Sequence, residues 1–243
     1  MGVDVWDNLR WAIDSASDMQ PDLVVVTGDL ALNWGTEEIY RAAASAFQRF
    51  GANVLYTPGN HDDRSLFREV FGRRYQLSEA HPWIDLSVEV AGIGQVLLDS
   101  GDASVSEQQL RWLDAVLHSR ASAARRGEST TNTMVWTHYP LIKGFHRYMD
   151  ANWSLANGSA VLDLLERYTG DLDISVFSGH YHCEHAELTS GVRHYVTPAT
   201  YLQIDPSATD LQYSTLGPGF RLVDVSPVQH PETAVVYRNR DGR

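Results

Sequence analysis

Cysteine is almost absent from this 243-residue sequence, which contains only Cys183. A single cysteine excludes an internal disulfide framework and fits a reducing compartment, so we predict a cytoplasmic protein. Long hydrophobic runs are also lacking: none approaches the roughly 18 apolar residues of a membrane-spanning helix, and we expect no signal peptide. Basic residues are scarce, because 19 Lys and Arg stand against 31 Asp and Glu, for a net charge of −12. Such a surface does not favour a nucleic-acid polymer or an anionic membrane as partner.

The composition is otherwise that of a folded protein. Hydrophobic residues make up 43% of the chain and charged residues 21%, which is enough to bury a core. Length alone allows either two small domains or one large one. Residues 121–131 combine small and polar side chains with two adjacent arginines, and we expect a solvated loop there and not a domain boundary. We therefore predict one domain over residues 1–243.

Short β-branched runs and helical patterns together predict the α/β class. The first element is a helix over residues 4–19, which Pro21 ends, and no strand precedes it. Further helices are expected over residues 37–50, from the capping box at Ser106 onward, and over about 157–168. Strands are expected at residues 22–28, 53–57, 133–137 and 174–177, with a hairpin at 84–99 and the remaining strands around 186–197, 219–225 and 233–238.

Asp29 is the first candidate functional residue. It follows the run Leu23–Val26, which is too short and too β-branched to prefer a helix and suits a buried parallel strand. Gly28 lets the chain turn away at the carboxyl end of this strand, where open α/β sheets collect their ligands. On its own, however, a strand-end aspartate is usually a cap or a turn residue.

Three other predicted strands also end in residues that can bind a metal. The complete set is Asp29, Asn60, His138, His180 and His182. Alternation along an extended segment would place His180 and His182 on the same side. Oxygen and nitrogen ligands of this mix suit zinc, manganese, iron or a similar divalent ion, and two ions bridged by a carboxylate can clamp a phosphate. A lone histidine after a strand is more often a surface residue, so the prediction rests on the set as a whole.

Four sequence blocks give this set a family resemblance. They are Gly28-Asp29, Gly59-Asn60-His61-Asp62, His138 with Pro140, and Gly179-His180-Tyr181-His182. In order and spacing they resemble the calcineurin-like metallophosphoesterase superfamily, from about residue 5 to the end of the chain. Softer similarities, such as Leu97-Leu98-Asp99-Ser100, resemble the class III cyclic-nucleotide phosphodiesterases within it.

The resemblance implies a fold, a reaction and a role for each residue. The fold would be a four-layer α/β/β/α sandwich, and the protein a phosphodiesterase that hydrolyses 3',5'-cyclic nucleotides or related small phosphodiesters through metal-activated hydroxide. Asp29 would bridge two metal ions, manganese, iron or zinc. Asn60, His138 and His180 would complete one metal site, and His182 would belong to the other. His61 would protonate the leaving oxygen, which is strongly basic and needs a proton donor.

One family motif is not found in the sequence. The family places Asp-x-His after an initial strand, where it supplies two ligands to the second metal, whereas here Asp4 is followed by Trp6 and no apolar strand lies upstream. Either a segment precedes this sequence or the protein has only one complete metal site. We favour the first alternative because the helix at 4–19 and the strand at 22–28 fit the family's second and third elements. For the chain as given, we expect weak or absent binding of the second ion.

Other residues are weaker candidates. Arg64, His146 and Tyr201 are predicted substrate contacts. Arg64 could instead form an ion pair, His146 could lie on the surface, and Tyr201 could have a packing role. Cys183 is expected to be a small buried residue. A phosphatase or glycerophosphodiesterase that uses the same site is an alternative function. An alternative of another class is a catalytically silent domain that binds a nucleotide or partner. The expected partner is a small phosphodiester substrate. The sequence allows a homodimer but does not decide the oligomeric state.

Overall fold

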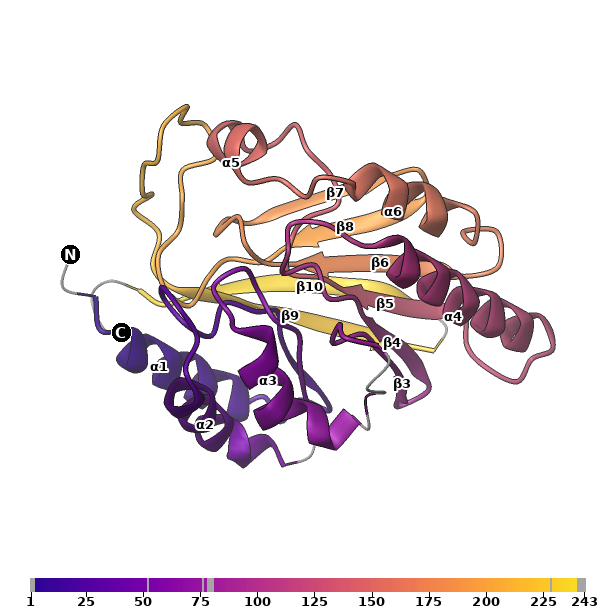
Figure 1. The fold of residues 1–243 in the computed structure, drawn as a ribbon, viewed down its shortest axis with the longest axis horizontal. Helices are drawn as coiled ribbons and strands as arrows, with labels where there is room; N and C mark the ends of the chain where they lie inside the picture. The colour runs from indigo at the N-terminus through magenta and orange to yellow at the C-terminus, as the bar shows by residue number, and fades with distance from the viewer. Residues whose placement is uncertain (1–2, 52, 76, 78–80, 228, 240–243) are drawn as a thin grey trace.

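Three sheets and two groups of helices form the computed structural model of the protein (Figure 1). It describes residues 3–51, 53–75, 77, 81–227 and 229–239. The helices are α1 (Val5–Ser17), α2 (Glu37–Ala46), α3 (Arg64–Phe71), α4 (Glu107–Arg125), α5 (Arg147–Asn152) and α6 (Gly158–Glu166), with 3-10 helices at Phe47–Phe50 and Gly72–Tyr75. The strands are β1 (Val24–Val26), β2 (Val54–Tyr56), β3 (Leu86–Val90), β4 (Ile93–Leu97), β5 (Asn132–Trp136), β6 (Asp173–Ser178), β7 (His185–Thr189), β8 (Val192–Val196), β9 (Gly219–Ser226) and β10 (Gln229–Tyr237).

The largest sheet has six strands in the order β3-β4-β5-β6-β8-β7. Strands β4, β5, β6 and β8 run parallel, and the edge strands β3 and β7 are antiparallel to their neighbours. A separate parallel pair joins β1 to β2, and β9 and β10 form an antiparallel hairpin. Because parallel strands place their carboxyl ends at one edge of a sheet, the residues that follow β5 and β6 are brought together there.

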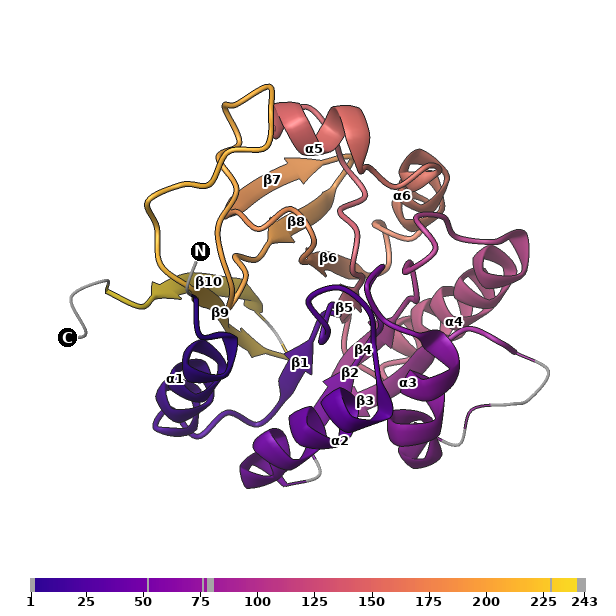
Figure 2. The ribbon, with the colours of Figure 1, turned by 60° about the vertical axis from the view of Figure 1, so that its left-hand side comes forward.

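The layers can be followed from side-chain alternation along single strands. In β2, Val54 and Tyr56 pack with helices α1, α2 and α3, whereas Leu55 packs against Leu86 and Leu97 of the six-stranded sheet. From a second side, α1, α2 and α3 lie together on the side of β1 and β2 opposite to α5 and α6 (Figure 2). The short β1–β2 pair is therefore covered on both faces, with β2 fully buried and β1 partly buried.

The outer face of the six-stranded sheet is covered by α4 and α6. Their apolar faces join one core cluster with the strands, to which α4 contributes Leu113 and Leu117, α6 contributes Val161 and Leu165, and β6 contributes Ile174. Helices thus cover one sheet on each side of a two-sheet interior. The predicted α/β fold with four α/β/β/α layers is confirmed.

The expected loop at residues 121–131 is wrong in its first half. Helix α4 extends to Arg125 and takes up half of the predicted loop at 121–131, because fully buried Ala121 continues the apolar face at one turn from Leu117. The prediction of a single domain over residues 1–243 stays a prediction. Among the described residues, none of the helices combines the length and the hydropathy that a membrane span requires.

Candidate metal centre

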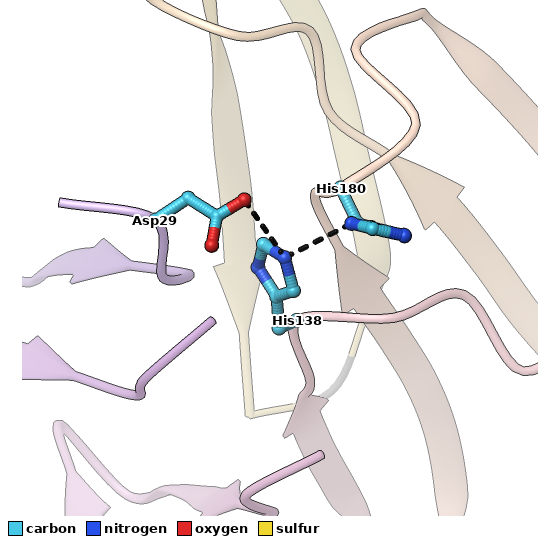
Figure 3. Close-up of side chains that lie close together, drawn as sticks. All are labelled: Asp29, His138 and His180. Atoms are coloured by element: carbon cyan, nitrogen blue, oxygen red, sulfur yellow. Dashed lines mark hydrogen bonds and ion pairs between the residues drawn. The ribbon is translucent and has the colours of Figure 1, made fainter. Parts of the chain in front are cut away.

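Side chains from three strand ends meet at one point (Figure 3). Asp29 follows β1, His138 follows β5 and His180 follows β6. One ligand atom from each of these residues lies within 4.8 Å of the ligand atoms of the other two. The structure thus brings these three strand-end side chains together.

His138 Nε2 is the centre of this group. It lies 3.2 Å from Asp29 Oδ2, 3.1 Å from Asn60 Oδ1 and 3.1 Å from His180 Nδ1. A single ring N–H donates one well-formed hydrogen bond. A proton on Nε2 therefore cannot hydrogen-bond to all three of these acceptors. Four atoms that carry lone pairs thus converge, and a cation can neutralise their mutual repulsion. Oxygen and nitrogen ligands of this mix fit zinc, manganese or iron.

Backbone carbonyl groups orient the two imidazoles. His138 Nδ1 lies 2.7 Å from the Thr27 carbonyl oxygen, and His180 Nε2 lies 2.9 Å from that of Trp153. A neutral imidazole that donates from one nitrogen keeps a lone pair on the other. His138 Nε2 and His180 Nδ1, which face each other, are therefore the nitrogen atoms left to bind a cation. Such carbonyl contacts are typical of metal-binding histidines.

His182 lies outside this group of three. Its Nδ1 atom is 2.8 Å from the Leu202 carbonyl oxygen, which leaves Nε2 free in the same way. The expectation that His180 and His182 share a side through alternation is wrong in its premise, because β6 ends at Ser178 and both histidines have positive φ angles, 61° and 49°. The segment is a turn, and its histidines are placed by the left-handed backbone.

Left-handed backbone is concentrated at the site. Of the seven non-glycine residues with positive φ in the described chain, three are Asp29 (55°), His180 and His182. Such conformations are uncommon and cost free energy unless the surroundings hold them. Their clustering at the predicted ligands indicates that the fold maintains this arrangement for a functional reason.

Two glycines let the Asp29 and Asn60 loops approach closely. At Gly28 (φ 98°) a Cβ atom would lie 2.5 Å from the Gly59 nitrogen and 2.7 Å from His138 Nδ1. At Gly59 a Cβ atom would overlap the Asp29 carboxylate. Any larger residue would therefore push the two loops apart.

Buried Asp62 ties these same loops together. Its carboxylate accepts hydrogen bonds from the amides of Gly59 (2.9 Å) and Leu30 (3.4 Å) and from the Tyr40 hydroxyl (3.2 Å). The Tyr40 oxygen in turn accepts from the amide of Asp63 at 2.7 Å. Burial raises the pKa of Asp62. A side chain that links three segments in this way fixes the loops that carry Asp29 and Asn60.

The charges of the site balance one another. Burial opposes ionisation of Asp29, but His138 and the His61 amide outweigh burial and lower the pKa of that carboxyl. Burial likewise opposes the charged form of His138, and Asp29 nevertheless raises the pKa of this imidazole. Burial and the neighbouring His138 hold the pKa of His180 well below its usual range, and burial lowers that of His182. Asp29 thus attracts one positive charge to His138 Nε2, the position that a metal ion would share.

His61 is placed by two contacts. Its backbone amide donates to Asp29 Oδ1 (2.9 Å), and its ring Nδ1 lies 3.2 Å from the carbonyl oxygen of Asn33. Nδ1 is then the donor to that carbonyl, and Nε2 is the nitrogen that can exchange a proton with a ligand. The side chain lies beside the cluster and is partly exposed.

The weaker candidates Arg64, His146 and Tyr201 are not part of this group of metal-binding side chains. The guanidinium of Arg64 is paired with Asp99 and Asp102. His146 has no exposed surface and caps α5, and Tyr201 is partly buried. Cys183 is buried as expected, and burial raises the pKa of its thiol to about 12.

Sequence reasoning missed the groups that hold the ligands in place. The carbonyl groups at Thr27, Trp153 and Leu202 have no side-chain signal that a sequence pattern can reveal. Asp62 was visible, since it ends the Gly59–Asp62 block, but its position next to His61 did not indicate a structural role. The Asp99 carboxylate follows an apolar run in the same manner as Asp29 and resembled another strand end.

Comparisons with known proteins find relatives over nearly the whole chain. A profile described as calcineurin-like phosphoesterase matches residues 2–184. A probable cyclic nucleotide phosphodiesterase of Fibrobacter succinogenes is 31% identical over 237 residues, which cover 98% of this chain and 87% of that protein. The 3',5'-cyclic adenosine monophosphate phosphodiesterase CpdA of Escherichia coli K12 is 26% identical, with 100% and 84% covered. Among solved structures, purple acid phosphatase PPD1 from yellow lupin superposes with a TM-score of 0.62 at 14% identity, over 99% of this chain and 48% of that one.

Proposed function

The chain belongs to the calcineurin-like phosphoesterase family, and from this premise we propose a metal-dependent phosphodiesterase for 3',5'-cyclic nucleotides or related small phosphodiesters. Membership of this family makes it a hydrolase with a metal-dependent site. The finer assignment, the substrate and the role of each residue, is supported by the site and by the names of the relatives.

The convergence on His138 Nε2 carries the proposal. Asp29, Asn60, His138 and His180 would hold one divalent ion, and His182, with Nε2 free, would serve a neighbouring one. A bound ion supplies a Lewis acid for the phosphate oxygens and lowers the pKa of water toward neutrality. The protein's own part is to fix these ligands through the carbonyl contacts of the histidines and to keep the site in a largely buried position.

His61 would supply the proton for the leaving oxygen. The contacts of its amide and Nδ1 direct the remaining nitrogen, Nε2, to this task. A phosphodiester's alkoxide is a poor leaving group, and a positioned donor contributes about 100-fold to 10,000-fold. Asp29 accepts a hydrogen bond from the His61 amide and so couples the position of the proton donor to that of the metal ligands.

Two exposed tryptophans favour a substrate with a flat ring. Trp34 is 65% exposed, and its neighbours Asn33 and Gly35 both hydrogen-bond to His61. Trp153 is 51% exposed, and its own carbonyl meets His180. Indole rings stack on nucleobases, whereas a glycerol group offers no face to stack on. This observation supports the cyclic nucleotide over the glycerophosphodiester alternative.

Substrate comparison tests the function. The full chain loaded with manganese is assayed on cAMP, on glycerophosphocholine and on p-nitrophenyl phosphate, with Asp29→Asn as the inactive control. We expect the highest kcat/KM on cAMP and a several-fold rise in KM for cAMP in Trp153→Ala. Preference for the monoester would assign a phosphatase instead, and preference for glycerophosphocholine would assign a glycerophosphodiesterase. A manganese-binding protein that hydrolyses none of the three would be the silent binding domain.

A further inference from the structure

Arg64 makes an ion-pair arrangement that the proposed function does not use. It is the first residue of α3 and stands three positions after His61. Its Nε and Nη2 atoms donate to the two oxygens of Asp99 at 2.7 and 3.0 Å, and Nη1 donates to Asp102 at 2.9 Å. A two-point contact of this kind fixes the orientation of both groups as well as their distance. The guanidinium is therefore committed to these carboxylates.

Asp99 is itself rigidly held. Its carboxylate is fully buried and also accepts from the amides of Ile84 and Gly101, each at 3.1 Å. Its own amide donates to Asp85 at 2.8 Å. The side-chain amide of Gln109, part of the cap of α4, donates both to the Asp99 carbonyl (2.7 Å) and to Asp85 (3.1 Å). The acceptor for Arg64 is thus anchored to the six-stranded sheet and to α4.

The same turn holds the other half of the metal centre. Ser100 Oγ accepts from the amides of His138 and Tyr139, both at 3.1 Å. Gly101 lies against the loop that carries Asn60, since a Cβ atom there would be 2.9 Å from the Gly59 carbonyl oxygen. Residues 99–102 therefore contact both segments that must meet at the site, and Arg64 is the charged link from one of them.

We propose that Arg64 is a positioning residue: its pairing with Asp99 locks the Asn60–His61 loop against the 99–102 turn and so aligns the proton donor with His138. This inference rests on the proposed function. It replaces the predicted substrate contact of Arg64 with an indirect role. The guanidinium works through a rigid fork, so a lysine, which presents one point charge, should substitute only in part.

A pair of variants separates alignment from stability. Arg64→Met removes the link and leaves the Asp99 charge buried without its partner, which destabilises the fold. Arg64→Met combined with Asp99→Asn removes both charges, so thermal stability should recover while the loop stays unlocked. Asp102→Asn is the matched control, because this second partner of Arg64 is 57% exposed.

Kinetics with two leaving groups report on the alignment. On cAMP, we expect kcat to fall at least 30-fold in Arg64→Met and in the double variant, with KM within threefold of the wild type. On bis(p-nitrophenyl) phosphate, whose leaving group needs no proton, the loss should stay below fivefold. Arg64→Lys should recover part of kcat, and Asp102→Asn should remain within twofold. A raised KM with unchanged kcat would mean that Arg64 contacts the substrate, and recovery of kcat in the double variant would reduce its role to stability.

Hydrogen exchange gives a readout that is independent of turnover. The amides of Gly59, His61 and Asp63 are all hydrogen-bonded in this loop. We expect the peptide over residues 58–66 to exchange at least tenfold faster in the double variant than in the wild type and in Asp102→Asn. Unchanged exchange would overturn the proposal, even if the wild type hydrolyses neither substrate and the proposed function itself has failed.

Discussion

The two halves of the metal centre are supported by different means. His138 and His180 follow adjacent strands of the six-stranded sheet, where β5 and β6 are paired over five residues. Asp29 and Asn60 follow β1 and β2, which are paired over only three. A three-residue pair has few ladder hydrogen bonds, so it specifies the loops beyond it less firmly than the larger sheet does.

The weaker half is compensated by side chains. The histidine half depends on carbonyl groups and on Ser100, whereas the carboxylate half depends on Asp62, Tyr40 and Arg64. Side-chain contacts can be removed one at a time by mutation, and carbonyl contacts cannot. We therefore predict that substitutions at residues other than the metal ligands loosen the loops of Asp29 and Asn60 more readily than the loops of His138 and His180.

The largest effect should come from removing His138, the ligand of the histidine half that also contacts Asp29 and Asn60. His138→Ala takes away the nitrogen around which three ligand atoms gather, so affinity for manganese should fall on the order of 100-fold or more. His182→Ala, which lies outside this group, should change the affinity of the first ion less than fivefold. Isothermal titration on both variants measures the difference. Equal losses would show that His182 belongs to the same site.

Removing the proton donor should have the next largest effect. His61→Ala should lower kcat on cAMP by about 100-fold or more, but on bis(p-nitrophenyl) phosphate by less than about 10-fold, because an activated leaving group needs little protonation. Initial rates at saturating substrate give the ratio. A uniform loss on the two substrates would argue against the acid role.

A hydroxyl deletion in the carboxylate half, with a control outside the metal centre, tests whether side chains support that half. Tyr40→Phe removes a buried donor to Asp62 and an acceptor for the Asp63 amide, and should lower the free energy of unfolding by about 1–2 kcal/mol and weaken manganese binding several-fold. The control is Tyr168→Phe, which removes a hydrogen bond to Asp114 of α4. Its loss should stay below about 1 kcal/mol, with manganese binding unchanged. Urea unfolding and titration calorimetry measure both, and equal effects on manganese binding would mean that Tyr40 does not support the carboxylate half specifically.

The smallest effect is a pH dependence in the network behind Arg64. Burial raises the pKa of Asp85 to about 6, above its unfolded value of 3.8. The folded state then binds this proton more tightly than the unfolded state does. The contribution of protonated Asp85 to the free energy of unfolding is therefore full below about pH 4 and is lost as the pH rises toward 6. Asp85→Asn keeps acceptors for Asp99 and Gln109 and should flatten this fall. Urea unfolding between pH 4 and 7 measures it, and parallel curves for the variant and the wild type would contradict the assignment.

The order of elements and the strand ends that carry ligands could be predicted from the sequence, because short β-branched runs that stop at glycine are local signals. The fine placement could not. His180 and His182 were expected on an extended strand, and only the folded backbone reveals that they occupy left-handed turns. An ion pair was one of the alternatives for Arg64, but its partner Asp99 is 35 positions away and could not be identified from the sequence. Contacts of this range and carbonyl groups without side-chain identity leave no pattern in a single sequence.

The position of a bound metal tests the central claim most directly. Crystals grown with zinc and measured at the zinc absorption edge should show an anomalous peak about 2.0–2.2 Å from His138 Nε2, His180 Nδ1 and an oxygen of Asp29, with Asn60 Oδ1 as a further ligand. The side chains should move little, because the carbonyl contacts already orient both imidazoles. An ion bound elsewhere, or a zinc-loaded protein with no peak among these four residues, would contradict the account.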